Sequence, residues 1–153
     1  MKRKDLGPMK MSKLFFLGAL ILLVLMGACD STTSTTELET SDPATPVGSW
    51  SLRAFDLAGG QTVLVPAPER YRLDLGSEGD ANVRADCNSC SGSYRSSGAT
   101  LQMGLLACTL IACPPGSLDG EYLRALGSAS SFERSEEALS IVYTDGVLRF
   151  GPT

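Results

Sequence analysis

The sequence predicts an α+β domain, made mostly of antiparallel strands in a curved or barrel-like sheet with one short helix. Three observations lead to this fold class. Short segments of alternating polar and apolar residues recur from residue 49 to the end of the chain. Turns rich in glycine separate these segments. The apolar spacing changes to a helical period at a single place, where Leu118, Tyr122 and Leu126 are four residues apart.

The predicted strands follow one another with short turns between them. The first alternates polar and apolar residues around Trp50, which indicates a strand with one buried face. The Asp145-Gly146 turn between two alternating segments is typical of a tight hairpin. In chain order, the predicted strands are 49–55, 61–65, 71–75, 81–85, 93–95, 100–103, 131–134, 138–143 and 147–150. Connections this short favour antiparallel pairing, because parallel strands need long crossovers.

One short amphipathic helix is predicted between the sixth and seventh of these strands. Tyr122 and Leu126 lie on the same face of a helix, because residues four apart are neighbours on its surface. Ser117 or Asp119 is placed to cap the start of the helix, and Gly127 is placed to end it. The helix is therefore expected to pack one apolar face against the sheet.

The first 28 residues are typical of a lipoprotein signal peptide. A basic segment, 1–13, precedes an apolar segment, 14–26, which is shorter than the about twenty residues that a membrane-spanning helix needs. The segment Leu25–Cys29 (LMGAC) resembles a bacterial lipobox, whose cysteine is acylated and becomes the mature N-terminus. We therefore expect acyl chains such as palmitate on Cys29, and a membrane as the partner that they contact. The alternative is an uncleaved N-terminal anchor.

The chain divides into three predicted regions: the signal peptide 1–28, the acylated cysteine with a disordered tether 29–47, and the folded domain 48–153. The tether is rich in Ser, Thr and Pro, so it has too little apolar surface to order itself. As a flexible coil it would span roughly 20–25 Å. The expected location is the cell envelope, lipid-anchored to a membrane, with the domain facing the periplasm or the exterior.

Composition excludes several classes of function. The chain contains no histidine, so Ser-His-Asp, Cys-His and histidine–zinc sites are excluded. Beyond Ala28, eight arginines face sixteen Asp and Glu residues, a formal charge of −8, so no nucleic-acid partner is expected. Asp74, Asp80 and Asp86 lack the spacing of a calcium loop and are predicted to be solvated acids. No catalytic, metal-ligating or cofactor-binding residue is predicted.

A family resemblance covers residues 48–152. The motifs that carry it are Trp50-Ser51-Leu52, Cys87-Asn88, Gly92-Ser93-Tyr94, Leu106-Ala107-Cys108-Thr109, Ala112-Cys113-Pro114, Glu121 with Leu126, and Leu148-Arg149-Phe150. Together they resemble the META domain (HslJ-like) family of bacterial envelope proteins. Two departures are Asp86, where the family usually has Gly, and Leu110-Ile111, where Arg-Met is common. The resemblance implies a small β-rich fold with one helix, often secreted or lipid-anchored, and no established catalytic activity.

Four cysteines lie in two clusters, Cys87-x-x-Cys90 and Cys108-x4-Cys113, and allow three interpretations. Two disulfides are favoured, because an exported domain folds in an oxidising compartment. A four-cysteine zinc site is the second interpretation, although its second pair is too widely spaced. A redox-active Cys-x-x-Cys is the third, although such motifs usually begin a helix and this one does not.

The resemblance also implies a pairing of these cysteines. Cys87 and Cys113 are the positions that the family pairs, which makes a nested second bond between Cys90 and Cys108 natural. A local Cys87–Cys90 bond is disfavoured, because two intervening residues in an extended chain strain the Cα separation. A crossed pairing would need the returning segment to run parallel to the first cluster.

Three classes of function remain in competition. The first is a non-enzymatic, lipid-anchored envelope protein with a stress-related or structural-interaction role and, as a possible contact, an unidentified envelope protein. The second is a small disulfide-stapled inhibitor or binding module of an envelope or host enzyme. An exposed apolar loop would favour it, and Pro66-Ala67-Pro68 is the single weak candidate for such a loop. The third, less favoured, is a thiol oxidoreductase.

Overall fold

The computed structural model describes residues 45–153. The predicted signal peptide, Cys29 and most of the predicted tether lie outside the described residues. The strands are β1 (Gly48–Leu57), β2 (Thr62–Leu64), β3 (Tyr71–Leu75), β4 (Asp80–Ala85), β5 (Asn88–Ser97), β6 (Thr100–Met103), β7 (Ala107–Cys108), β8 (Ser131–Arg134), β9 (Leu139–Tyr143) and β10 (Gly146–Pro152). A 3-10 helix, η1 (Pro68–Arg70), precedes β3, and the α-helix α1 (Asp119–Gly127) precedes β8.

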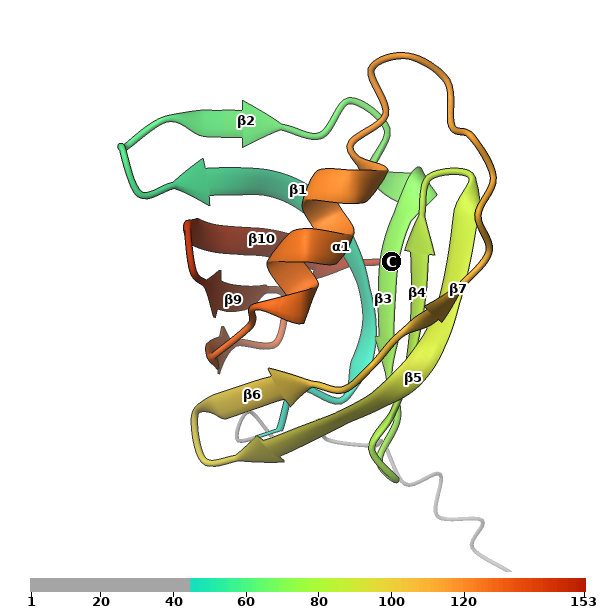
Figure 1. The fold of residues 1–153 in the computed structure, drawn as a ribbon. Coiled ribbons are helices and arrows are strands. Elements are labelled where there is room, and N and C mark those ends of the chain that lie inside the picture. Colours follow the sequence, from blue (N-terminus) through green and yellow to red (C-terminus); the bar gives the residue numbers. More distant parts are fainter. Residues whose placement is uncertain (1–44) are drawn as a thin grey trace, which may run out of the picture. The chain divides into compact units, whose positions relative to one another are not determined.

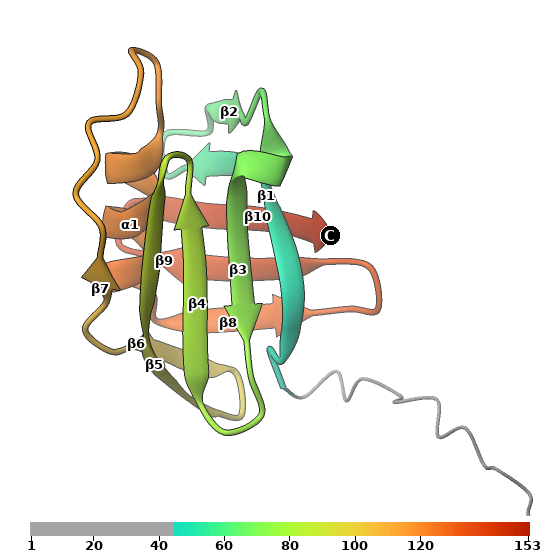
Figure 2. The ribbon, with the colours of Figure 1, turned by 90° about the vertical axis from the view of Figure 1, so that its right-hand side faces the viewer.

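The strands form a closed antiparallel barrel (Figures 1 and 2). All ten belong to one sheet, but β2 pairs with β1 alone and β7 pairs with β5 alone, so the other eight make the ring. The ring closes where β1 pairs with β10, from Trp50 opposite Pro152 to Leu57 opposite Gly146. A register shift in β1 between Leu52 and Ala54 bends the strand at this seam. Closure removes the unpaired edges that an open sheet of this size would expose.

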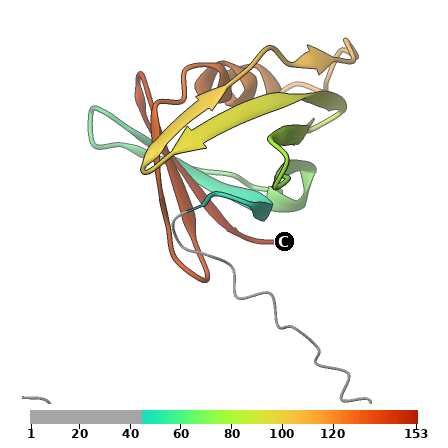
Figure 3. The same ribbon diagram turned by 90° about the horizontal axis from the view of Figure 1, so that it is seen from below.

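The helix α1 lies against the barrel and contributes side chains to its core. In Figure 1 it lies in front of the barrel, and in Figure 3, seen from below, it lies along one side. Tyr122 and Leu126 have no exposed surface and pack among the inward-facing residues of the strands. The Tyr122 ring meets Tyr71 edge-on with 6.0 Å between ring centroids. The barrel interior of the described domain is therefore a packed core.

The Tyr122 hydroxyl is buried in this core without a hydrogen-bond partner. Burial raises the pKa of this hydroxyl well above its ordinary value, and the charge of Asp74 adds to the effect. The cause is desolvation, because the phenolate form has no water around it in the core. The neutral phenol is thus the form that the folded domain accepts.

The fold confirms the predicted class, a mostly antiparallel, barrel-like α+β domain with one short helix. The third strand and the strand 131–134 have the predicted bounds, and the predicted helix is α1. Two short elements were missed, β7 and the 3-10 helix η1, and the first half of β5 was missed as well, because the predicted strand began at residue 93. In the first half of β5, Ser and Gly dilute the apolar alternation, whereas the two residues of β7 are too few to show any alternation. Among the described helices, none has the length and apolar character needed to span a membrane.

Candidate functional site

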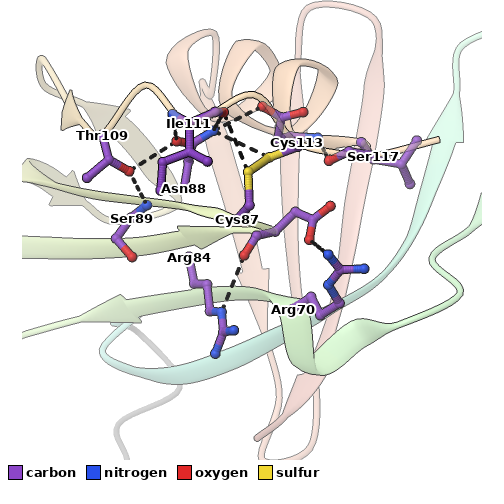
Figure 4. Close-up of a disulfide and its surroundings, with 12 residues drawn as sticks. Arg70, Arg84, Cys87, Asn88, Ser89, Thr109, Ile111, Cys113 and Ser117 are labelled. Carbon is purple, nitrogen blue, oxygen red and sulfur yellow. Dashed lines mark hydrogen bonds and ion pairs between the residues drawn. A yellow bond between two sulfur atoms is a disulfide. The ribbon is translucent and has the colours of Figure 1, made fainter. Parts of the chain in front are cut away.

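The candidate site is the loop Thr109–Leu118, here called the apical loop, with the residues that hold it in place. It connects β7 to α1 at the end of the barrel where β3 begins, β4 ends and β5 begins (Figure 1). Three kinds of interaction fix it: a disulfide, the side chain of Asn88 and the hydroxyl of Tyr71 (Figure 4 shows the first two). Tyr71 begins β3, Asn88 begins β5 and Cys87 directly precedes Asn88, so the barrel itself positions the loop.

Both disulfides join one cluster of cysteines to the other. Cys87 is bonded to Cys113, with 5.6 Å between Cα atoms, and Cys90 is bonded to Cys108, its direct partner in the β5–β7 ladder. These are the two nested pairs that the family resemblance implies. Because all four sulfur atoms are bonded in pairs, none is a thiolate that could bind zinc or exchange with another disulfide. Within residues 45–153, no group of three His, Cys, Asp or Glu residues is arranged to hold a metal ion.

The Cys87–Cys113 bond and the hydrogen bonds of Asn88 are together called the brace of the apical loop, and Asn88 is its polar part. Its side-chain oxygen accepts hydrogen bonds from the Ile111 backbone N–H at 2.8 Å and from the Thr109 hydroxyl at 3.0 Å. Its side-chain nitrogen donates to the Ile111 carbonyl at 3.0 Å, and to a carboxylate oxygen of Asp119 at 3.4 Å. Asn88 is 5 % exposed, so these bonds replace water that its amide has lost. The amide thus satisfies both backbone polar groups of Ile111.

The second half of the apical loop is fixed by Tyr71 and by a tight turn. The Leu118 backbone N–H donates to the Tyr71 hydroxyl at 2.9 Å, just before α1 begins. Just before Leu118 the chain makes a turn, in which the Ser117 N–H donates to the Pro114 carbonyl at 3.1 Å and Gly116 has φ +84°. Proline at the second position and a left-handed glycine at the third are the requirements of a type II turn. The N-cap of α1 is Leu118 and not Ser117 or Asp119 as predicted, although the Ser117 hydroxyl accepts a bond from the Asp119 N–H at 3.3 Å.

Asp86 corrects one expectation. It was predicted to be a solvated acid, yet it is 3 % exposed and forms an ion pair with Arg70. The Tyr71 hydroxyl also lies 3.4 Å from its other carboxylate oxygen. Its φ of +57° is in the left-handed region, which explains why glycine suits this position and why aspartate, among other residues, tolerates it. The charge of Arg70 offsets the burial of the carboxylate.

The other two aspartates behave as predicted. Asp80 is exposed, and Asp74 is half-buried beside Arg72 at 3.4 Å. Residues 76–79 form the turn that joins β3 to β4, and Gly79 N–H donates to the Gly76 carbonyl at 3.1 Å. Five aromatic residues are buried in the core: Trp50, Tyr71, Tyr94, Tyr122 and Tyr143.

The apical loop leaves large apolar side chains in solvent. Leu110 is 96 % exposed and Ile111 is 57 % exposed. Sequence reasoning missed this pair and considered Pro66-Ala67-Pro68 instead, but Pro68 begins η1, where it is half-buried. The available signal was the Pro-Pro-Gly-Ser turn, which marks a loop and begins three residues after Ile111. Without a packing partner for that loop, its aliphatic residues remain outside the core.

A small apolar cleft lies between α1 and the β1–β2 hairpin. It has a volume of about 240 Å³, and its walls include Phe55, Val63 and Tyr143. Arg124 lies at this cleft, but its guanidinium donates to Asp145 at 2.6 Å and is therefore already paired. Small-molecule sites are usually clefts of about 300–1,000 Å³ with a few convergent polar groups. The apical loop is the stronger candidate.

A closed barrel with a packed core, one covering helix and two disulfides defines a small stapled β-barrel module whose distinctive feature is a surface loop. The chain belongs to the META domain family, whose model matches residues 44–152. A comparison with curated proteins finds no match. The structure resembles the NMR structure of a protein from Burkholderia xenovorans, with a TM-score of 0.60 and 28% identity over 84% of this chain and 99% of that chain. It also resembles the crystal structure of a DUF4847 family protein from Bacteroides vulgatus, with a TM-score of 0.52 and 12% identity over 69% and 92%. The second likeness concerns the fold alone.

Proposed function

We propose that this chain is a lipid-anchored protein of the cell envelope, whose META domain is a non-enzymatic module for contact with another envelope protein. The observation that carries the proposal is the division of apolar residues in the domain. The interior is filled by α1 and the strands, whereas Leu110 and Ile111 lie outside on a braced loop. A filled interior favours contact at the surface over chemistry in a cavity.

Membership in the META domain family supports the non-catalytic part of the proposal. The anchoring part is supported by the sequence. Leu25–Cys29 resembles a lipobox, and Cys29 then carries two or three acyl chains, enough for durable membrane attachment. The acidic, histidine-free composition adds to the case against a nucleic-acid partner and a histidine-based active site.

Intact mass analysis of the protein extracted from membranes tests the anchor. The expected product begins at Cys29 and carries two or three acyl chains. In the Cys29→Ser variant, acylation and lipoprotein processing are expected to stop, because serine lacks the acceptor sulfur. A mature N-terminus at any other residue would contradict the anchoring part of the proposal.

Proximity labelling in living cells tests the contact. A labelling enzyme fused to the C-terminus of the full chain should mark a reproducible envelope protein, and a matched lipoprotein with an unrelated domain is the control. Equal labelling of the same proteins by both fusions would show that membrane location alone accounts for the contact. Turnover of ester, peptide, glycoside or phosphate substrates by the purified protein would contradict the non-enzymatic part.

A further inference from the structure

The backbone of the apical loop is held rigidly at the residues whose side chains are free. Ile111 has both backbone polar groups bonded to the buried amide of Asn88, and Cys113 is cross-linked to Cys87 two residues further on. Leu110 is nevertheless almost fully exposed, and Ile111 is more than half exposed. The brace therefore gives these two side chains a defined position without using them in the core. Preorganisation of this kind reduces the entropy lost when a partner binds.

The apical loop and the residues just before it carry no charge of their own. Residues 104–118 contain no Asp, Glu, Lys or Arg, whereas the described domain as a whole has eight arginines and twelve acids. A partner that binds here gains nothing from charge, and a charged surface would lose hydration without compensation. The complementary surface is therefore apolar and uncharged. Anionic partners such as nucleic acids have no cation to pair with in this stretch.

The apical loop and the start of the described chain lie at opposite ends of the barrel. Gly48, close to the tether, pairs with Leu75 at the end of β3. Asn88 pairs with Ala85, which pairs with Tyr71 at the start of β3. The two ends are thus separated by the length of β3, about 13 Å at the usual rise per residue, and Figures 1 and 2 both show the loop at the end of the barrel away from the beginning of β1.

This arrangement favours a protein partner over the anchoring bilayer. Fifteen residues, 30–44, separate Cys29 from the described domain, and the apical loop lies at the end of the barrel opposite the point where these residues join it. Residues 104–118 also lack the Trp, Tyr, Lys and Arg residues that typically contact membrane interfaces. A fluid bilayer, moreover, gains little from a braced backbone, whereas a protein pocket of fixed shape gains affinity from it.

We propose that the apical loop inserts Leu110 and Ile111 into an apolar, uncharged pocket of an envelope protein that meets the end of the barrel opposite the tether. This inference rests on the proposed function, which it deepens by naming the contact surface and the chemistry of the partner. The pocket is concave, because the loop that fills it is a convex segment with both ends fixed by the barrel.

Leu105 provides a matched control for this contact. It is 98 % exposed, close to the value of Leu110, and it has the same side chain. Its backbone lies against Gly92, which pairs with Ala81, and Ala81 pairs with Leu75 near the tether end. A contact that depends on general hydrophobicity involves both leucines, whereas a contact through the apical loop involves Leu110 alone.

Site-specific photocross-linking in living cells, followed by binding measurements, tests the proposal. A diazirine analogue of leucine is placed at position 110 or 105 of the full-length protein. The expected result is one protein adduct from position 110 that is absent from position 105.

The partner identified in that adduct is then purified and titrated with the anchored protein in detergent. Leu110→Ser should raise Kd by about 10- to 100-fold, because the free energy gained by burying one leucine side chain corresponds to that range. Leu105→Ser should leave Kd unchanged. Both variants should keep the urea midpoint of the parent protein.

Several outcomes would overturn the proposal. They are no protein adduct from position 110, equal adducts from positions 110 and 105, an adduct with a second copy of this chain, or a partner whose Kd is insensitive to Leu110→Ser. Binding of the Cys29→Ser protein to phosphatidylethanolamine and phosphatidylglycerol vesicles that is lost in Leu110→Ser would identify a bilayer as the occupant instead. The anchor is judged separately: an unacylated Cys29 together with an intact position 110 adduct would contradict the proposed anchoring and leave the loop contact standing.

Discussion

The helix α1 and the apical loop are adjacent in sequence but are stabilised in opposite ways. In α1, Tyr122 and Leu126 are fully buried, so the helix is held by apolar packing. In the loop, Leu110 is almost fully exposed, and the backbone is held by the Cys87–Cys113 bond and by Asn88. The difference shows that a chain can fix a backbone by covalent and hydrogen bonds and keep its side chains available. Apolar packing cannot do so, because it uses the side chains themselves.

The largest expected effect is on the helix side of this comparison. Leu126→Ala should lower the free energy of unfolding by about 2–5 kcal/mol, because it leaves a cavity in a closed core. The matched change Leu110→Ala should alter it by no more than about 0.5 kcal/mol, as an exposed substitution does. Urea denaturation of both variants measures the difference. Equal losses in the two variants would mean that the loop contributes to the core after all.

The next effect concerns the covalent part of the brace. Cys87→Ala or Cys113→Ala should cost about 3 kcal/mol, the value expected for releasing a loop of this size. Cys90→Ala or Cys108→Ala should cost less, since its bond closes a shorter loop within one that is already closed. Thermal or urea unfolding ranks the variants. Peptide mapping without reduction checks the pairing, and a Cys87–Cys90 peptide or free thiols at these four positions would contradict it.

The hydrogen-bonded part of the brace should have a smaller effect. Asn88→Ala should cost about 1–3 kcal/mol, because it leaves the buried polar groups of Ile111 without partners. Hydrogen exchange at the Ile111 amide should become faster, which a loss of core packing elsewhere would not single out. Asn82→Ala, an exposed change on β4, is the control. Unchanged exchange at Ile111 would show that the disulfide alone holds the loop.

The smallest effect at neutral pH is expected for Tyr122→Phe. Its hydroxyl makes no hydrogen bond, so the change should alter stability by less than about 1 kcal/mol and can increase it. At alkaline pH the two proteins should diverge. Burial raises the folded-state pKa of Tyr122, so the unfolded chain releases its proton first, near pH 10, and the stability of the parent falls as pH rises above that value. The variant lacks this contribution and should lose stability less steeply. Parallel curves would show that Tyr122 is not the responsible group.

Most of the secondary structure could be predicted from the sequence. Alternation of inward and outward residues is a local property, so segments such as Tyr71–Leu75 were placed with correct bounds. The Tyr122 and Leu126 spacing likewise specified α1 and its buried face. The nested cysteine pairs followed from the family resemblance, and the structure contains the same two pairs.

Tertiary structure decided what depends on segments far apart in the chain. Closure of the barrel rests on the pairing of β1 with β10, almost a hundred residues away, which no local pattern specifies. Asp86 is buried because Arg70, at the end of η1, and Tyr71, at the start of β3, converge on it, although an aspartate in a turn suggests solvent. Leu110 and Ile111 have the composition of core residues and remain outside, because Asn88 and Cys87 hold their backbone where no apolar surface covers them. Local sequence states how apolar a residue is, and only the packed chain determines whether anything lies against it.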